Sequence, residues 1–395
     1  MATLLFVFIF IIYIGLGIPD STIGSAWPAI QSNLNLPISY ASFITMIISS
    51  FTVIASFFSA RIINRFGTGI VTAFSTLLSA LALLGFSLSS SMLCFCLLSI
   101  PLGLGAGAID SALNSYVAVR YKAIHMSFLH CFYGVGVALS PFVFSFALKL
   151  NENWRLGYKL VFAIQMLLVL IAFLSLPLWN KIKKREITTG EAIKPITLSY
   201  VQMAKTPAIS IGWLVFFLAC GIEFTCDTWA SSFFVKSLDQ ASDFGATMLT
   251  LYFVGMTLGR FASGIISIKL SNKKIIFSGY CLMALGITML FLPIQPILRG
   301  VGLFLIGFGN GPIFPNLSYL TPIMFGKQYS QSIMSSQMAV SNLGILILPP
   351  VFGVLAQAIS IDLFPFFVGG MFVLLVLCTF LYFKKSKNTT IAIEN

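Results

Sequence analysis

Long runs of this chain carry almost no charge, and this feature restricts its possible folds more than any other. Between Met1 and Ala60 the only charged residue is Asp20, and between Phe66 and Val119 it is Asp110. Each run has room for two helices of about 20 apolar residues, the length that crosses the hydrocarbon core of a bilayer. About one-quarter of the residues in soluble domains are charged, whereas only 9% of these 395 residues are charged. The sequence therefore predicts an integral membrane protein.

The rest of the chain divides in the same way into eight further spans. They are Ala123–Leu148, Leu160–Asn180, Thr206–Val235, Phe244–Ile268, Ile275–Leu298, Gly300–Gly326, Gln328–Ile361 and Leu363–Phe383. These runs are apolar on every face, whereas the strands of a membrane barrel alternate apolar and polar residues. We therefore predict an all-α membrane protein with twelve transmembrane helices. Met1–Ile18 has no basic leader, so we expect it to be the first span and not a cleaved signal peptide.

The net charge of +12 could suggest a nucleic-acid partner, but the placement of the charges indicates a membrane topology. Cytoplasmic loops of membrane proteins are enriched in Lys and Arg. If both termini are cytoplasmic, Arg260 lies within a span and seventeen of the other Lys and Arg residues lie on the cytoplasmic side. Five lie outside, namely Lys149, Arg155, Lys159, Lys236 and Arg299. We expect a multi-pass protein of the plasma (inner) membrane. Its expected partners are the lipid bilayer and a small-molecule substrate, with no nucleic acid, and its expected state is monomeric.

A glycine-rich segment of the sequence recurs 204 residues later in the chain. Gly103–Gly107 has three alternating glycines, and Gly307–Gly311 has the same three 204 residues later. Residues 60–69 and 264–273, the loops after spans two and eight, match at the same offset. Such a repeat favours duplication of a six-helix unit. We therefore predict an N-terminal half at residues 1–180, a cytoplasmic basic linker at 181–205, a C-terminal half at 206–383 and a cytoplasmic tail at 384–395.

Twelve spans in two pseudo-symmetric halves, with a basic central loop, resemble the ground plan of the major facilitator superfamily. The loop signature of that family survives here as Asn64-Arg65-Phe66-Gly67. Asn64 stands where an acidic residue is usual, and Thr68 and Gly69 replace a basic pair. The resemblance implies a structural role for Arg65 and Gly67, and Arg65 can still meet the C-terminus of a helix.

Four further patterns resemble the branch that contains the fucose–proton symporter and the sodium-dependent glucose transporters. They are Gly103 to Asn114 (G-x-G-x-G-x-x-D-x-x-x-N), Leu129 to Gly136, Gly221-Ile222-Glu223 followed by Trp229, and Gly309 to Asn316. In the fucose symporter an acidic residue stands where Asp110 stands, and a glutamine occupies the place of His130. The resemblance implies that Asp110 couples transport to a cation and that Asn114 and His130 bind a sugar.

Acidic side chains at membrane depth support this interpretation independently. A carboxylate there costs at least about 2.5 kcal/mol, so it must face a cavity, a partner or a bound cation. Asp20, Asp110, Glu223 and Asp227 all lie in predicted spans, and only Arg260 shares their environment. We therefore predict cation coupling at these four acids, with Arg260 structural. The alternatives are a structural hydrogen bond at Asp110, a helix-capping role for Asp20 and a vestibule charge at Asp227.

The polar neighbours of these acids are candidate substrate ligands. Asp110 and Asn114 lie one turn apart on one helix face. Asp20 follows Gly15, Gly17 and Pro19, which should break span one and free backbone carbonyls for a ligand. Other candidates are His130, Trp229, Asn310 and Asn342, with Asn316 and Gln337 as further cavity amides. His130 could equally be a hydrogen-bonded structural residue, and Trp229 could anchor a helix at the membrane interface.

These observations favour transport over catalysis. The sequence has no G-x-x-x-x-G-K-[ST] nucleotide-binding run, no metal-ligand spacing and no nucleophile–base pair, so we predict no enzyme activity, no metal and no cofactor besides a coupling proton or sodium ion. The seven cysteines all fall in spans and are expected to be packing residues. We predict a secondary transporter that moves a hexose or related sugar by cation symport with alternating access. The alternative is a proton-coupled exporter of drugs or other metabolites.

Overall fold

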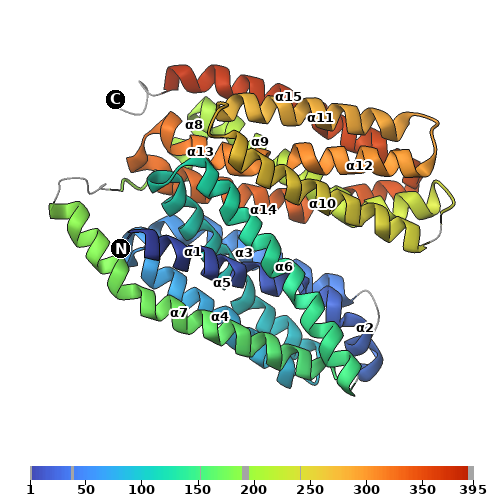
Figure 1. The fold of residues 1–395 in the computed structure, drawn as a ribbon, viewed down its shortest axis with the longest axis horizontal. Coiled ribbons are helices and arrows are strands. Elements are labelled where there is room, and N and C mark those ends of the chain that lie inside the picture. The colour runs from blue at the N-terminus through green and yellow to red at the C-terminus, as the bar shows by residue number, and fades with distance from the viewer. Residues whose placement is uncertain (1, 37–39, 152, 189–194, 241, 390–395) are drawn as a thin grey trace. The chain divides into compact units, whose positions relative to one another are not determined.

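The computed structural model describes residues 2–36, 40–151, 153–188, 195–240 and 242–389, which form helices and no strand. In the N-terminal part these are α1 (Ala2–Gly17), η1 (Ile18–Ser21), α2 (Thr22–Leu34), α3 (Tyr40–Phe66), α4 (Thr68–Leu88), α5 (Met92–Arg120), α6 (Ala123–Asn151) and α7 (Trp154–Thr188). The others are α8 (Tyr200–Lys205), α9 (Pro207–Lys236), α10 (Ser242–Ile266), α11 (Asn272–Phe291), α12 (Pro296–Asn310), α13 (Ile313–Phe325), α14 (Lys327–Ala358), η2 (Ile361–Leu363) and α15 (Phe364–Thr389), as Figure 1 shows.

Twelve segments of the described chain are long and apolar enough to cross a membrane, as predicted. Two of these spans are interrupted well inside their length. The first is α1, η1 and α2 in succession, and the tenth is α12 followed by α13. Pro19 lies in η1, and Pro312 precedes α13. Proline lacks the N–H that continues an α-helical ladder, so both breaks have a cause in the sequence.

The largest differences between the predicted and the observed helix ends are at spans nine and six. Span nine was expected to reach Leu298, but α11 ends at Phe291, because prolines at 293 and 296 interrupt the helical ladder and Pro296 begins α12. Span six was expected to end at Asn180, but α7 continues to Thr188, since the Lys, Arg and Glu residues that follow are good helix formers. Part of the predicted linker is therefore helical. Residues 189–194 of the linker and 390–395 of the tail lie outside the described residues.

The chain forms two compact units. The first comprises Met1–Tyr116 and Leu129–Thr197, and the second comprises Val117–Phe128 and Leu198–Asn395. Within the first unit α7 packs against α4 and α1. Figure 1 shows that the beginning of α1 and the end of α7 lie at the same end of this unit, as six crossings require.

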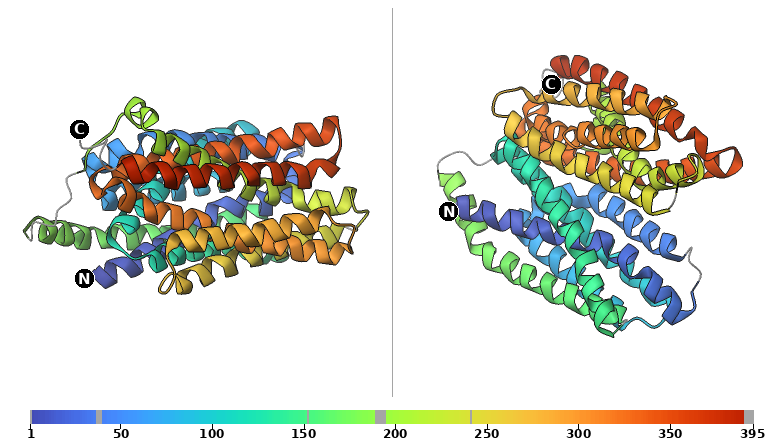
Figure 2. Two further views of the ribbon diagram at one scale, coloured as in Figure 1. Left: turned by 90° about the horizontal axis from the view of Figure 1, so that it is seen from above. Right: turned by 45° about the vertical axis from the view of Figure 1, so that its right-hand side comes forward.

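In the second unit α9 is the central helix. It packs against α14, α15 and α10. Figure 1 shows α12 between α10 and α11, and Figure 2 shows the yellow to red helices of this unit from two further sides. The core of this unit contains side chains from all of these helices, for example Phe216, Tyr252 and Phe352, each fully or almost fully buried. A polar side chain on the inner face of α9 is therefore surrounded by other helices of its own unit.

The first and third of the repeated glycines allow the same close helix–helix contact in each unit. A Cβ at the first or third glycine would lie 2.2–2.4 Å from a backbone carbonyl oxygen of a neighbouring helix, α3 in the first unit and α10 in the second. The pairs are Gly103 with Ile48, Gly107 with Thr52, Gly307 with Tyr252 and Gly311 with Met256. The carbonyl residues are themselves 204 positions apart. The same offset therefore relates tertiary contacts as well as sequence, and only glycine permits so close an approach.

Candidate functional site

Four polar side chains meet inside the first unit in a hydrogen-bonded group that we call the Asp110 cluster. The Tyr13 hydroxyl donates to Asp110 Oδ1 at 2.6 Å, and Asn114 Nδ2 donates to the same oxygen at 2.7 Å. Asn114 Nδ2 also lies 2.7 Å from the Tyr13 hydroxyl. His130 Nε2 lies 3.0 Å from Asn114 Oδ1. The cluster therefore joins a phenol, a carboxylate, an amide and an imidazole.

The cluster draws on three helices: α1 supplies Tyr13, α5 supplies Asp110 and Asn114, and α6 supplies His130. The predicted one-turn spacing does place the carboxylate and the amide together. Because the Asn114 nitrogen must face the carboxylate, its oxygen faces His130, and His130 Nε2 must donate the proton. Tyr13, Asn114 and His130 are buried, whereas Asp110 is half-buried. Asp110 is therefore the member of the cluster most open to a ligand.

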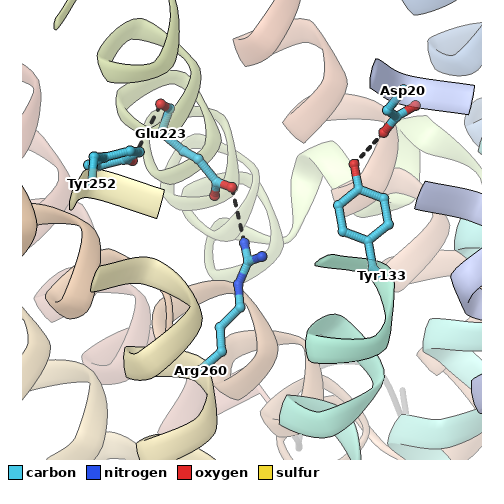
Figure 3. Close-up of polar contacts among 5 residues, drawn as sticks. All are labelled: Asp20, Tyr133, Glu223, Tyr252 and Arg260. Carbon is cyan, nitrogen blue, oxygen red and sulfur yellow. Dashed lines mark hydrogen bonds and ion pairs between the residues drawn. The ribbon is translucent and has the colours of Figure 1, made fainter. Parts of the chain in front are cut away.

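The second polar group of this unit lies where span one breaks. The Tyr133 hydroxyl of α6 donates to Asp20 Oδ2 of η1, as Figure 3 shows. The helices come close enough because glycines face each other: a Cβ on Gly17 would lie 2.2 Å from the Tyr133 carbonyl oxygen, and one on Gly136 2.0 Å from that of Ile14. The Tyr13 and Tyr133 rings are 6.2 Å apart, centroid to centroid. The two predicted acids of this unit are thus bound by two neighbouring tyrosines.

The helix break predicted in span one is present, but the backbone carbonyls beside it are not left free for a ligand. The carbonyl oxygen of Gly15 accepts from Gln165 at 3.1 Å, and that of Ile18 accepts from the Ser140 hydroxyl at 2.6 Å. The carbonyl oxygen of Pro19 accepts from the Thr22 hydroxyl at 2.7 Å. Buried backbone acceptors need partners, and nearby side chains supply them here. The expectation of carbonyls free for a ligand was wrong at these three positions.

In the second unit, Glu223 of α9 forms an ion pair with Arg260 of α10. Arg260 Nη2 lies 3.0 Å from Glu223 Oε1, and the two side chains are 12% and 17% exposed respectively. The Tyr252 hydroxyl of α10 also lies 3.4 Å from the Glu223 backbone oxygen (Figure 3). Glu223, predicted as a coupling acid, therefore has a basic partner. Arg260, predicted as structural, neutralises this acid.

Asp227 and Asn310 lie near this pair. Asp227 is on α9 one turn after Glu223 and is half-buried, and its carboxylate has no hydrogen bond or ion pair to any residue that the structure describes. Asn310 is the last residue of α12, at the break in span ten, and is 3% exposed. It lies beside the Tyr252 side chain, but neither of its amide atoms makes a well-formed hydrogen bond within the described chain. These two candidates therefore keep binding capacity.

The remaining candidate ligands have internal partners. Trp229 Nε1 donates to the Pro349 carbonyl oxygen at 2.8 Å, and its ring contacts Phe352 at 5.7 Å between centroids. Asn342 Nδ2 donates to a carbonyl of its own helix, that of Met338, at 2.9 Å. The other two amides are also bound inside the unit: Asn316 to Ser263, Asn272 and Pro312, and Gln337 to Thr321.

The loop signature lies between α3 and α4. Gly67 has a φ of 87°, a conformation that residues with a Cβ rarely adopt, so glycine is required for this turn. Arg65 is in the last turn of α3, where a positive charge favours the helix C-terminus, and lies over the Phe66 ring. Asn64, which replaces the usual acid, donates to the Thr197 hydroxyl at 2.9 Å.

The sequence interpretation missed the two buried tyrosines, Tyr13 and Tyr252. Each is an isolated phenol in an apolar span, and a buried tyrosine hydroxyl usually has a hydrogen-bond partner. That rule could have marked both residues as members of polar groups without showing which groups. No set of three or more His, Cys, Asp or Glu residues that could hold a metal ion occurs in the described ranges.

Comparison with known proteins identifies the family. A family model described as the Major Facilitator Superfamily matches residues 5–247 and 232–393. Bypass of stop codon protein 6 of Saccharomyces cerevisiae is 23% identical, over 95% of this chain and 81% of that protein. The glucose/mannose transporter GlcP of Bacillus subtilis is 28% identical, over 62% of this chain and 61% of the length of GlcP.

Solved structures show the same fold. FucP, the E. coli fucose:proton symporter, matches in its outward conformation with a TM-score of 0.73 and 14% identity, over 94% of this chain and 98% of that chain. The proton:xylose symporter XylE matches with a TM-score of 0.72 and 15% identity, over 94% of both chains. The chain is therefore a multi-pass membrane protein of the Major Facilitator Superfamily, a family of transporters and not of enzymes, which confirms the family, the fold class and the absence of enzyme activity predicted from the sequence.

Proposed function

We propose that this protein is a secondary active transporter that moves a hexose or related sugar together with a cation, a proton or a sodium ion, by alternating access. The Asp110 cluster carries the proposal. It places a half-buried carboxylate at membrane depth among groups that can donate and accept hydrogen bonds. A carboxylate in that position needs a compensating charge, and a sugar hydroxyl needs donors and acceptors of this kind.

The cluster suggests how cation and sugar binding are linked. While Asp110 is ionised, it accepts hydrogen bonds from both Tyr13 and Asn114. Charge-assisted hydrogen bonds are the stronger kind, so neutralisation of Asp110 by a cation weakens its hold on both donors. Those donors then become available to a sugar hydroxyl. Asp20, bound by Tyr133, is the second proposed coupling acid of this unit.

The relatives support a sugar as cargo. GlcP is named as a glucose/mannose transporter, and its 28% identity covers 62% of this chain. FucP and XylE share the fold and are described as symporters of a sugar with a proton. We further propose a plasma-membrane location with both termini cytoplasmic, a monomeric state and the domain boundaries given above. The distribution of Lys and Arg supports the proposed orientation.

Uptake by proteoliposomes tests the proposal. The purified protein should concentrate a labelled hexose when a proton or a sodium gradient is imposed, and the two gradients applied separately identify the ion. Asp110→Asn should lose gradient-driven accumulation, because an amide cannot cycle a proton and is a poor cation ligand, but should keep some exchange of sugar.

Asp239→Asn is the matched control, since Asp239 is an exposed acid outside α9. It should concentrate sugar as well as the parent does. If Asp110→Asn also accumulates sugar normally, Asp110 is structural and coupling belongs to another acid. If no hexose is taken up while hydrophobic cations bind tightly, the protein is an exporter.

A further inference from the structure

We propose that the beginning of α11 and the end of α15, which meet at one end of the second unit, bind the headgroup of an anionic phospholipid. The site uses none of the polar groups described above. Binding there does not depend on which cargo the protein carries, so the inference goes beyond the proposed function.

A ring contact joins the first turn of α11 to the end of α15. Lys273 Nζ lies 4.8 Å from the centroid of the Phe383 ring, and the Phe277 ring lies 6.1 Å from that ring, centroid to centroid. Figure 1 shows the two helices side by side. Lys274 and Lys384 directly follow the contacting residues, and both side chains are exposed. Ammonium groups from two helices therefore gather at one place.

The second unit has no acidic residue near these lysines among the described residues. Four of its acids lie between residues 223 and 243, on α9, at the start of α10 and between these helices, and Asp362 lies at the opposite end of span twelve. The remaining acid, Glu394, lies outside the described residues. The first turn of α11 also has two lysines and no acid, although the positive end of the helix dipole favours acids there. An external anion would balance this charge.

Each exposed lysine continues a face of its helix that is exposed along the span. On α15, Leu377 and Phe380 are 56% and 62% exposed, and they precede Lys384 by seven and four residues. On α11, Leu285 is 53% exposed and lies eleven residues, or about three turns, after Lys274. Exposed apolar faces of membrane spans contact acyl chains, and lysines near helix ends extend to the headgroups. A ligand with an acyl chain beside its phosphate fits both features, which favours a phospholipid over free phosphate.

The charge of the site selects among phospholipids. A lysine ammonium is a compact charge that binds phosphate oxygens. A zwitterionic headgroup carries a cation of its own, which these lysines repel, so the site favours a headgroup with net negative charge. The orientation proposed above places this end of the unit at the cytoplasmic leaflet, where anionic lipids give the membrane surface a negative potential.

Native mass spectrometry of the full-length protein, released from detergent micelles, tests the site without any sugar. Titration with a phosphatidylglycerol should give a tight one-to-one adduct, and a phosphatidylcholine with the same acyl chains should bind more weakly. We expect Lys274→Gln/Lys384→Gln to weaken the phosphatidylglycerol adduct by on the order of 30-fold, since each lysine near a membrane surface contributes about fivefold. Lys274→Arg/Lys384→Arg keeps both charges and should retain the adduct.

Lys205→Gln/Lys236→Gln is the matched control. It removes two charges from exposed lysines of the same unit, but these lie on either side of α9, a helix of 30 residues, and cannot hold one phosphate together. This variant should bind the lipid as the parent does.

Three results overturn the proposal. They are no adduct with the parent protein, equal loss in the two glutamine variants, and equal affinity for the two lipids. Displacement of the lipid by an equal concentration of inorganic phosphate would reveal a site for free phosphate, which also contradicts a lipid site. Because no sugar is present, the lipid site stands or fails independently of the proposed transport of a hexose.

Discussion

Asn114 shows how a single residue can serve both the stability and the proposed function of the first unit. Its amide is fully buried. The nitrogen donates to Asp110, and the oxygen faces His130 Nε2. A sugar can therefore reach this amide only after the internal hydrogen bonds have rearranged. Asn114 holds Asp110 and His130 in place in the structure described here, and direct sugar recognition by Asn114 is still a prediction.

Asn114→Ala should lower stability because it removes buried hydrogen bonds, one of them to a carboxylate. A hydrogen bond to a charged group contributes about 1.5–3 kcal/mol; the variant loses the bond to Asp110 Oδ1 and the contacts of this amide with the His130 ring and the Tyr13 hydroxyl. Thermal unfolding in detergent measures the effect. Asn342→Ala is the control, since that amide is half-buried and bonds to its own helix. An equal shift in the two variants would show that the Asp110 cluster contributes no special stability.

The same variant separates binding from coupling. If the amide also contacts a sugar, Asn114→Ala should weaken hexose affinity by about 1–3 kcal/mol, as measured by calorimetry at fixed pH. Cation dependence of uptake should persist, because the Asp110 carboxylate is still present. Unchanged affinity for every hexose tried would place the sugar contacts elsewhere.

At the scale of whole helices, the repeated glycines bring charged and polar side chains into register. Gly103 and Gly107 let α5 lie against α3, and Gly307 and Gly311 let α12 lie against α10. The first contact positions the helix that carries Asp110. The second positions Asn310 beside the residues of α10. Close helix packing in both units, and with it the position of the helix that carries Asp110, therefore depends on the same sequence repeat.

We expect alanine at these glycines to be more harmful than alanine at an open glycine. Gly103→Ala and Gly307→Ala would place a Cβ 2.3 Å and 2.2 Å from a carbonyl oxygen, so the helices must move apart. Overpacking of this kind costs about 1–3 kcal/mol. Gly370→Ala is the matched control, because a Cβ there meets no atom within 4 Å. The midpoint of thermal unfolding should fall in the first two variants and not in the third; a fall of similar size in all three would contradict the packing argument.

At the scale of the whole molecule, the distribution of basic residues predicts the orientation in the membrane. The asymmetry of Lys and Arg predicts that both termini and the 181–205 linker are cytoplasmic. In a cysteine-free variant, a cysteine at Asn153 should react with a membrane-impermeant reagent added outside intact cells. Asn153 is exposed, between α6 and α7. A cysteine at Thr189, which lies outside the described residues, should react only after the membrane is opened. The reverse pattern would invert the topology.

The amino-acid sequence by itself determined the number of spans, the helical class and the family of this protein. These properties depend on features that follow the chain in order: apolar runs of bilayer length, prolines that end helices, and motifs a few residues long. The break in span one was predictable for the same reason, because Gly17 directly precedes it and Pro19 lies within it.

Only the tertiary structure decided which partner each polar side chain has. Tyr13 and Asp110 are 97 residues apart, and Glu223 and Arg260 are 37 apart, yet each pair is within hydrogen-bonding distance. A hydrogen bond requires about 3 Å between heavy atoms, which depends on how each helix is rotated and shifted against its neighbours. Sequence spacing sets the face of one helix but not that rotation. For this reason Arg260 could be placed in a span from the sequence, whereas its pairing with Glu223, and the unpaired state of Asp227 among the described residues, required the folded chain.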